Sequence, residues 1–292
     1  MQKRKTLISA ITWISRLIPD KTFLELKYRY KIGSKLNLRN PRTYNEKLQW
    51  LKLYDRRPEY TMMVDKYEVR KFVTQKIGEE YLIPLLGVYD SFDEIDFSKL
   101  PDQFVLKPNH TSGNVFICKD KSKIDYALLR KKVNAWMKRR YYWVHREWPY
   151  KDVKPRIVCE KYLSVDGSVP DDYKFMCFNG DPRIVQVHHD RFGKHTQDYY
   201  DMCWNKLPIM NRQVPNSSLV VDKPFAFEKM KEFAKTLATG TKFSRIDFYE
   251  MEGKVYFGEI TLHPRAGFGI LEPLEYENLL GEWIDLSLRE YC

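Results

Sequence analysis

The sequence SRIDFY at residues 244–249, followed by VYFGEIT at residues 255–261, decides the fold. Both stretches are typical of β-strands, and the turn at residues 251–254 predicts that they form a hairpin. Alternation along the strands places four polar side chains on one face of it: Arg245, Asp247, Glu259 and Thr261. Two neighbouring carboxylates repel each other unless a cation lies between them. Mg²⁺, which commonly bridges one or two carboxylates and a nucleotide's phosphates, suits this pair, and a solvated acidic face is the alternative.

Composition indicates a packed globular protein of one large domain or two coupled ones. The chain has 292 residues, of which 43% are hydrophobic, and it is rich in Tyr and Phe. Its five cysteines are odd in number and include no CxxC pair, which disfavours a disulfide framework or a zinc site and favours a reducing compartment. The net charge of +11 favours an anionic partner. Because the basic residues are spread over the whole chain without a nucleic-acid-binding motif, we expect acidic glycans, nucleotide phosphates or an anionic membrane surface, and no nucleic acid.

The N-terminus carries an apolar run between residues 7 and 18, without an apparent cleavable signal. The run is too short to span a bilayer, and its helical spacing predicts an amphipathic helix. Such a helix most often packs on the protein's own core, and the alternative is a basic helix in peripheral contact with a membrane. We expect a cytoplasmic protein, with the inner face of the cell membrane as the alternative location.

Helices and hairpins are mixed along the chain, which predicts an α+β fold. Turn and capping residues at 40–43 precede a helix at 44–54, and Gly78 ends a second helix at 63–76. Three later segments are also expected to be helical: a basic helix at 126–142, a helix at 224–237 and a C-terminal helix. Extended segments are expected upstream of the hairpin at 81–89, 104–108, 115–118, 156–163, 173–179 and 182–188.

Three polar positions near strand or helix ends suggest a nucleotide site. Lys107 ends a strand before a small polar loop that contains Ser112 and Gly113, and the backbone N–H groups of such loops approach phosphates. An ordinary hairpin turn is the alternative reading. Lys66 lies at the predicted start of a helix. Glu160 closes an apolar strand, where it would either hold adenine and ribose or simply terminate the strand.

In this order the segments resemble the ATP-grasp superfamily. The resemblance rests on Asp65-Lys66 with Arg70, on 104–108 with Ser112-Gly113, on 158–163, and on 245–247 with 259–261. The superfamily usually has Glu-x-Asn in the last segment, so Thr261 is a departure and a weaker third metal ligand. The chain more closely resembles the TupA-like ATP-grasp proteins of cell-surface polysaccharide and teichuronopeptide synthesis. That resemblance covers about residues 38 to 292 and rests on 40–52, 64–70, 83–89 and 172–175.

The resemblance implies an ATP-grasp fold, in which two α+β lobes grip ATP, with an N-terminal helical extension. It divides the chain into an N-terminal helical segment, 1–60, and an ATP-grasp domain, 61–292. Within this domain the nucleotide lobe is expected at about 100–163 and the metal-binding lobe at about 164–292.

The resemblance also implies roles for individual residues. The phosphates of ATP are assigned to Lys66, Lys107 and the amides of Ser112 and Gly113. Adenosine is assigned to Glu160 with the backbone of Tyr162 and Leu163, and Mg²⁺ to Asp247, Glu259 and Thr261. The catalytic candidates are Arg245, which would stabilise a tetrahedral oxyanion, and Lys174, a further phosphate or substrate contact. The alternative for Lys174 is an exposed strand lysine.

Two further segments are candidates for substrate binding. The polar segment 188–195 invites a zinc reading, but adjacent His188 and His189 point to opposite faces of a strand. A lid or acceptor-binding loop, with Arg191 and Lys194 facing an anionic group, is favoured. His263 and Arg265 are expected to face the acceptor carboxylate, because Arg suits bidentate carboxylate recognition; stabilisation of a turn is the alternative.

Together these residues predict an ATP- and Mg²⁺-dependent carboxylate–amine ligase that acts through an acylphosphate. The expected substrates are an amino compound and a uronic-acid-containing capsular or surface polysaccharide, or its precursor. A glycosyltransferase is an alternative, although 93–96 and 171–172 are poor matches to an Asp-x-Asp motif. An ATP-dependent glycan kinase and a non-catalytic binder of anionic glycans are the remaining alternatives.

Overall fold

The computed structural model describes residues 16–164, 169–191, 193–218 and 221–287. The predicted amphipathic helix at 7–18 therefore lies outside the described residues, apart from a turn at 16–18. Within the described ranges, every helix is too short or too polar to cross a membrane.

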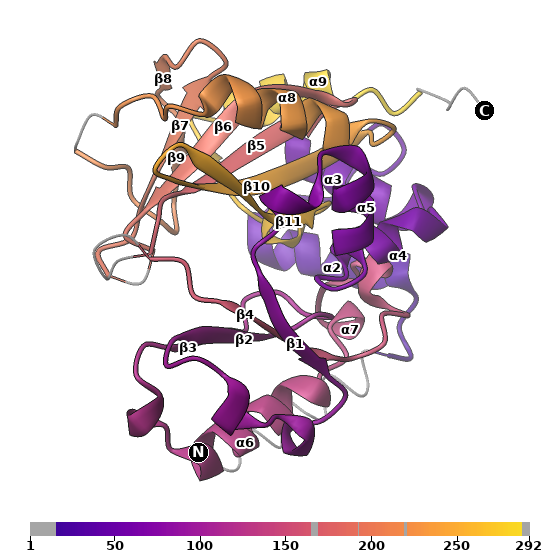
Figure 1. The fold of residues 1–292 in the computed structure, drawn as a ribbon. Helices are drawn as coiled ribbons and strands as arrows, with labels where there is room; N and C mark the ends of the chain where they lie inside the picture. Colours follow the sequence, from indigo (N-terminus) through magenta and orange to yellow (C-terminus); the bar gives the residue numbers. More distant parts are fainter. Residues whose placement is uncertain (1–15, 165–168, 192, 219–220, 288–292) are drawn as a thin grey trace.

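Two antiparallel sheets dominate the fold (Figure 1). The small sheet has the strand order β1-β4-β2-β3 and contains β1 Leu85–Tyr89, β2 Phe104–Pro108, β3 Phe116–Cys118 and β4 Ile157–Lys161. The large sheet has the order β11-β10-β5-β6-β7-β8. Its strands are β5 Asp172–Phe178, β6 Asp181–His189, β7 Thr196–Asp201, β8 Lys206–Leu207, β10 Phe243–Met251 and β11 Lys254–Thr261. A short ladder joins β9 Met210–Asn211 to β12 Leu271–Glu272.

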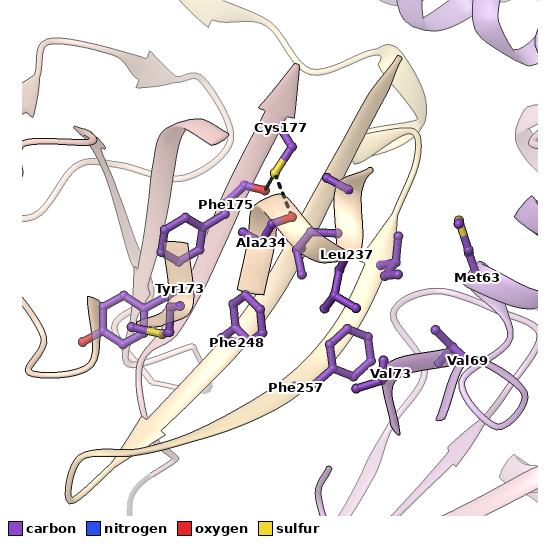
Figure 2. Close-up of a cluster of buried hydrophobic side chains, with 14 of the residues drawn as sticks. Met63, Val69, Val73, Tyr173, Phe175, Cys177, Ala234, Leu237, Phe248 and Phe257 are labelled. Carbon is purple, nitrogen blue, oxygen red and sulfur yellow. Dashed lines mark hydrogen bonds between the residues drawn. The ribbon is translucent and has the colours of Figure 1, made fainter. Parts of the chain in front are cut away.

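One face of the large sheet is apolar, and the other, the polar face, carries the charged residues of β5 and β10 beside a second apolar cluster that contains Met176, Phe178, Ile184 and Phe243. The apolar face packs on helix α8 Phe227–Ala238 and on α4 Pro58–Val64 and α5 Val69–Lys76. Figure 2 shows Phe175 and Phe248 of the sheet against Ala234 and Leu237 of α8. The polar face is thereby turned away from the main core and remains available for chemistry.

The small sheet is covered on one face by α6 Tyr126–Met137, whose Leu129, Val133 and Trp136 bury Phe104 and Leu106. Alternation sends the neighbouring residues of β2, including Val105 and Lys107, to the opposite face. That face looks toward the large sheet.

The N-terminal helices are packed onto the large sheet. Helix α3 Tyr44–Tyr54 lies against the C-terminal helix α9 Glu275–Trp283, and α2 Asp20–Ile32 lies beside α3. Tyr44 contacts the rings of Phe178 and Phe243 at centroid distances of 6.5 and 5.3 Å. Thr43 and Glu46 form a reciprocal capping box, which confirms the predicted cap and start of α3.

Two predicted helices are shorter than expected. The helix predicted at 63–76 is interrupted at residues 65–68, because the Asp65 carboxylate accepts backbone N–H bonds from Tyr67 and Glu68 at 2.8 and 3.3 Å. Lys66 therefore lies in a turn and does not open a helix. The helix predicted at 126–142 ends at Met137, and the separate α7 Tyr142–His145 follows.

Strand β7 was not predicted, because its sequence TQDYYD is polar and carries no apolar alternation. It is nevertheless buried at four consecutive positions. Asp198, fully buried, accepts a bond from Lys206 at 2.9 Å, and Gln197 and Gln186 both donate to the Tyr199 hydroxyl. Polar partners from neighbouring strands thus replace the usual apolar signal.

A pH-dependent stability is expected from Glu277, a buried residue of α9. Its carboxylate accepts bonds from Asn45 and Leu271, and burial raises its pKa from 4.5 to about 7. The unfolded chain then releases this proton at lower pH than the folded chain, so the contribution of Glu277 to stability falls as pH rises from 4.5 to 7. Glu277→Gln is expected to remove this fall. The free energy of unfolding should then rise by about 2–3 kcal/mol at pH 8 and change little at pH 4.5. Urea unfolding of both proteins across this range measures the difference; parallel curves would contradict the assignment.

Candidate active site

A cavity of about 350 Å³ opens between the two sheets and is lined by residues of both. Its small-sheet side is largely apolar and includes Val105, Ile117, Tyr162 and Leu163. A flat apolar slot of this kind suits a purine ring, with polar groups at its edge fixing orientation. The cavity brings together most of the site residues predicted from the sequence: Lys66, Lys107, Ser112, Gly113, Glu160, Tyr162, Leu163, Arg191, Asp247 and Glu259.

Glu160 is buried at this edge and pairs with two cations. Its carboxylate lies 2.6 Å from Lys107 Nζ and 3.6 Å from the guanidinium of Arg70 on α5. Glu160 and Lys107 lie on adjacent strands β4 and β2 and both face the cavity. Lys107 is thereby held at the cavity wall, where it can turn to an anionic ligand.

Lys66 connects the phosphate-type loop at 109–114 with the large sheet. Buried Asp65 accepts two bonds of 2.9 Å from the amide of Asn109, which fixes the turn to the loop. Lys66 Nζ donates to the Thr111 carbonyl at 2.7 Å and lies 3.8 Å from Glu259 Oε2. Burial lowers the pKa of Lys66, and the attraction of Glu259 opposes this shift.

On the large sheet, the four polar residues of the β10–β11 hairpin share one face, as predicted. Arg245 and Thr261 are direct cross-strand partners, and so are Asp247 and Glu259. Arg245 Nη2 lies 2.6 Å from Asp247, 3.3 Å from Glu259 and 3.1 Å from the Thr261 hydroxyl. Three oxygens therefore converge on one positively charged group.

Lys174 is buried on this face, at 3% exposure, so the alternative of an exposed strand lysine is wrong. It lies directly opposite Asp247 in the β5–β10 register, and its Nζ is 2.5 Å from both Asp247 and Asp172. Arg191 donates to Asp172 at 2.8 Å from the other side. Positive and negative groups thus alternate across three neighbouring strands.

The electrostatics of the two hairpin carboxylates follow from these contacts. Burial opposes ionisation of Glu259, but the attraction of Lys66, Arg245 and Lys174 lowers its pKa to about 2. Burial raises the pKa of Asp247, and Arg245 and Lys174 oppose that rise. The Glu259 side chain retains 30% exposure, against 2% for Asp247, so Glu259 is the more accessible of the two to a ligand.

Several other predicted site residues, including the predicted metal ligand Thr261, do not line this first cavity. Thr261, His263 and Arg265 line a second cavity of about 290 Å³, which also touches Arg245 and Glu259. Lys194 is exposed and lines neither of these two cavities; its backbone N–H donates to the Asp190 carboxylate.

The segment around His188 and His189 forms no metal site in the described part of the chain. His188 Nδ1 contacts His195 Nε2 at 2.7 Å, whereas His189 Nδ1 contacts the Asp171 carboxylate at 2.8 Å. The two side chains therefore have separate partners, in accord with the expectation that adjacent strand residues diverge.

The family of the chain is decided by its match to a family sequence model described as TupA-like ATP-grasp, which spans residues 46–285. The chain belongs to the TupA-like ATP-grasp family. The α+β architecture, with two sheets around a shared cavity, is the ATP-grasp fold predicted from the sequence. No curated protein sequence matches the chain significantly.

Several solved structures are similar to this ATP-grasp protein at low identity. D-Alanine–D-alanine ligase from Bacillus anthracis, complexed with ATP, is 16% identical, with 69% of this chain and 54% of that chain covered and a TM-score of 0.40. The ATP-grasp ligase PsnB, complexed with a phosphomimetic variant of minimal precursor, Mg and ADP, is 9% identical (coverage 74% and 56%, TM-score 0.42). D-Cycloserine synthetase DcsG is 13% identical (coverage 77% and 70%, TM-score 0.42). The chain thus spans little more than half the length of the first two.

The donor set of this ATP-grasp protein fits Mg²⁺. Asp247, Glu259 and Thr261 present hard oxygen atoms that already surround one positive group, the Arg245 guanidinium. The described residues contain no cluster of three or more His, Cys, Asp or Glu that would make an all-protein metal cage. Two carboxylates and a hydroxyl are sufficient for Mg²⁺, which usually completes its shell with water and substrate phosphates.

Several polar residues of the two cavities were missed as site candidates, among them Asp172, Tyr249, His195, Glu147 and Lys31. The signal for Asp172 was present, because it precedes Lys174 by two positions and therefore shares its face of β5. Tyr249 had the same signal, because it follows Asp247 by two positions on β10. The others depend on loop placement or on contacts between distant segments, for which the sequence carries no local signal.

Gly258 is required by the bulge that aligns the two carboxylates. The β10–β11 register shifts between Asp247 and Phe248, and a Cβ at Gly258 would lie 3.1 Å from the Asp247 carbonyl oxygen. Gly258→Ala is therefore expected to displace Asp247 and weaken MgATP binding about tenfold, or ~1.4 kcal/mol, in calorimetric titration. Gly33→Ala is the control: its left-handed backbone lies at the end of α2 with open space around it, so it costs stability only. Equal MgATP affinity in both variants would refute this role of the bulge.

Proposed function

We propose that this ATP-grasp protein is an ATP- and Mg²⁺-dependent ligase that activates a carboxylate as an acylphosphate and joins it to an amine. The observation that carries the proposal is the pairing of two opposed sets of groups across one cavity. Lys66, Lys107 and the loop at 109–114 lie on one side, and Asp247 with Glu259 lies on the other. Family membership supports the use of ATP.

Nucleotide binding is assigned to residues of both sheets. The apolar slot near Val105 and Leu163 takes the adenine ring, and Glu160 with the backbone of Tyr162 and Leu163 fixes its edge and the ribose. Lys66 and Lys107 neutralise the phosphates. Gly113 adopts a positive φ of 79° with open space around it, so the loop can bring the Ser112 and Gly113 amides close to phosphate oxygens.

The phosphoryl-transfer step requires positive charge around the γ-phosphate. Asp247, Glu259 and Thr261 would hold Mg²⁺, which neutralises the charge that develops on the phosphate oxygens. Lys174 and Arg245 keep the buried carboxylates ionised and oriented. The substrate carboxylate attacks the γ-phosphorus, and ADP leaves, which gives the acylphosphate.

In the second step an amine attacks the acyl carbon, and phosphate leaves. Arg245 lies at the boundary between the two cavities and can stabilise the tetrahedral oxyanion. We assign a uronic-acid-containing surface polysaccharide, or its precursor, as the carboxylate substrate. The positive net charge of the chain, together with Arg191 and Lys194, supports an acidic glycan.

The test is to incubate the protein with MgATP, polygalacturonate and hydroxylamine, and to measure both ADP and hydroxamate. Hydroxylamine captures acylphosphates as hydroxamates, so a ligase is expected to release ADP and hydroxamate in equal amounts, dependent on the acidic glycan. Lys107→Ala is expected to weaken MgATP binding and reduce both products, because it removes a phosphate contact worth about 1.5–3 kcal/mol.

Three results would contradict this function. A stable phosphorylated glycan formed without hydroxamate would indicate a kinase. Thermal stabilisation by UDP-sugars in place of ATP would indicate a glycosyltransferase. ADP release at the same rate without the glycan and without an amine would exclude coupled ligation.

A further inference from the structure

One oxygen of a buried carboxylate in the second cavity lacks a hydrogen-bond partner among the described residues. Glu147 lies between α7 and the short helix η5 Trp148–Tyr150, and its side chain is 5% exposed. Among the described residues its Oε1 atom has no hydrogen-bond partner, and Oε2 lies 3.8 Å from His263 Nδ1, too far for a hydrogen bond. Tyr141 is the one neighbour in the described chain that acts on the carboxylate through a side-chain hydrogen bond. Because an unsatisfied buried carboxylate costs several kcal/mol, a ligand that donates hydrogen bonds to it would recover that cost.

The nearby buried lysine does not satisfy Glu147. Lys52 is 1% exposed, and its Nζ donates to Gln49 Oε1 at 3.0 Å and to the carbonyls of His145 and Ala266 at 3.1 and 2.6 Å. Its charge acts on Glu147 only at longer range. The cavity wall therefore holds a carboxylate with spare acceptor capacity.

The same cavity contains two cations without an acidic partner. Arg265 donates to the neutral side-chain oxygens of Gln197, at 3.1 Å, and Gln213. Lys31 lines the cavity from α2 and is exposed. Among the described residues, neither forms an ion pair with a carboxylate. One cavity thus presents a negative site at Glu147 and a positive site at Arg265 and Lys31.

The second cavity adjoins the nucleotide cavity. Ser112 of the phosphate-type loop and Glu259 of the hairpin line both, and Arg245 and Thr261 line the second cavity. A molecule held there would lie next to the carboxylates assigned to the metal. This position suits the nucleophile that attacks an activated acyl group.

We propose that the second cavity binds the amine substrate as a zwitterion, an amino acid or similar compound, with its ammonium group on Glu147 and its carboxylate on Arg265 and Lys31. The proposal rests on the ligase function proposed above and names the chemical class of its amine. It also makes Glu147 the group that accepts the ammonium proton.

The proton and electron balance of this step is complete without a further reactant. The ammonium transfers one proton to the Glu147 carboxylate, and the nitrogen lone pair forms the C–N bond at the acyl carbon. The acyl C–O bond breaks, and its electron pair leaves with the phosphate, which takes one of the two remaining N–H protons; the other stays on the amide nitrogen. The products are an amide, hydrogen phosphate and protonated Glu147.

The surroundings of Glu147 favour this proton transfer. Burial raises its pKa to about 7, and the attraction of Lys52 opposes the rise. A side-chain hydrogen bond with Tyr141 and the attraction of Lys27 also lower the pKa of Glu147, whereas the charge of Glu259 raises it. A base with a pKa near the operating pH both accepts and releases a proton readily.

The test is calorimetric titration of the MgADP-loaded protein with glycine, L-alanine, L-glutamate and L-lysine. At least one is expected to bind the wild type, and Glu147→Gln and Arg265→Gln are each expected to weaken that binding about tenfold or more. The matched deaminated acid and decarboxylated amine are expected to bind about tenfold more weakly than the amino acid. Glu277→Gln is the control, because Glu277 is equally buried but lines neither cavity.

Two results would overturn the inference: no binding of any of these amino acids by the wild type, or unchanged binding by Glu147→Gln. Preference for the deaminated acid would instead assign the cavity to the carboxylate substrate and also overturn it. The hydroxamate assay separates this failure from failure of the ligase function. Hydroxylamine needs no amino-acid site, so hydroxamate formed by the wild type supports the ligase even if no amino acid binds, whereas absence of hydroxamate in the wild type refutes the ligase itself.

Discussion

The structure depends on the balance of buried charge across β11, β10 and β5. Asp247 is almost completely buried, and a carboxylate in that position is tolerated only because Arg245 and Lys174 donate to it from both sides. Glu259 is held ionised by the same cations and by Lys66. This balance is kept by protein groups alone in the absence of ligand. A nucleotide that brings phosphates and Mg²⁺ adds both signs of charge, so it can enter without leaving a carboxylate or a lysine unpaired.

The rest of the fold holds these charges in register. Helix α8 covers the apolar face of the large sheet, which fixes the polar face toward the small sheet. The Asp65–Asn109 contact ties the turn that carries Lys66 to the loop that follows Lys107, so Lys66 reaches Glu259 of the acidic hairpin. The N-terminal helices add a wall of the second cavity, through Lys31, and pack against the loop that carries Arg265.

Local patterns predicted much of this arrangement. The alternation of Arg245, Asp247, Glu259 and Thr261 required only that two strands pair through a short turn, and the pairing follows. The strand that presents Lys107 was also visible, because apolar residues and Pro108 define its ends. In these cases the physical cause of the structure lies within a few neighbouring residues.

Features that depend on distant partners could not be predicted. The burial of Lys174 requires Asp172 beside it and Asp247 from another strand, and the polar sequence of β7 is buried only because Lys206 and neighbouring glutamines satisfy it. The role of Glu147 rests on its Oε1 atom, which has no hydrogen-bond partner among the described residues, and no sequence pattern records such an absence.

The most direct test of the account is the affinity for ATP with and without Mg²⁺, compared between the wild type and the double variant Asp247→Asn, Glu259→Gln. The account predicts that Mg²⁺ strengthens ATP binding by the wild type, and that the variant loses about tenfold or more of MgATP affinity. Its affinity for metal-free ATP should stay equal or rise, because two negative charges near the phosphates are gone. MgATP affinity and turnover that both survive the double substitution would contradict the account.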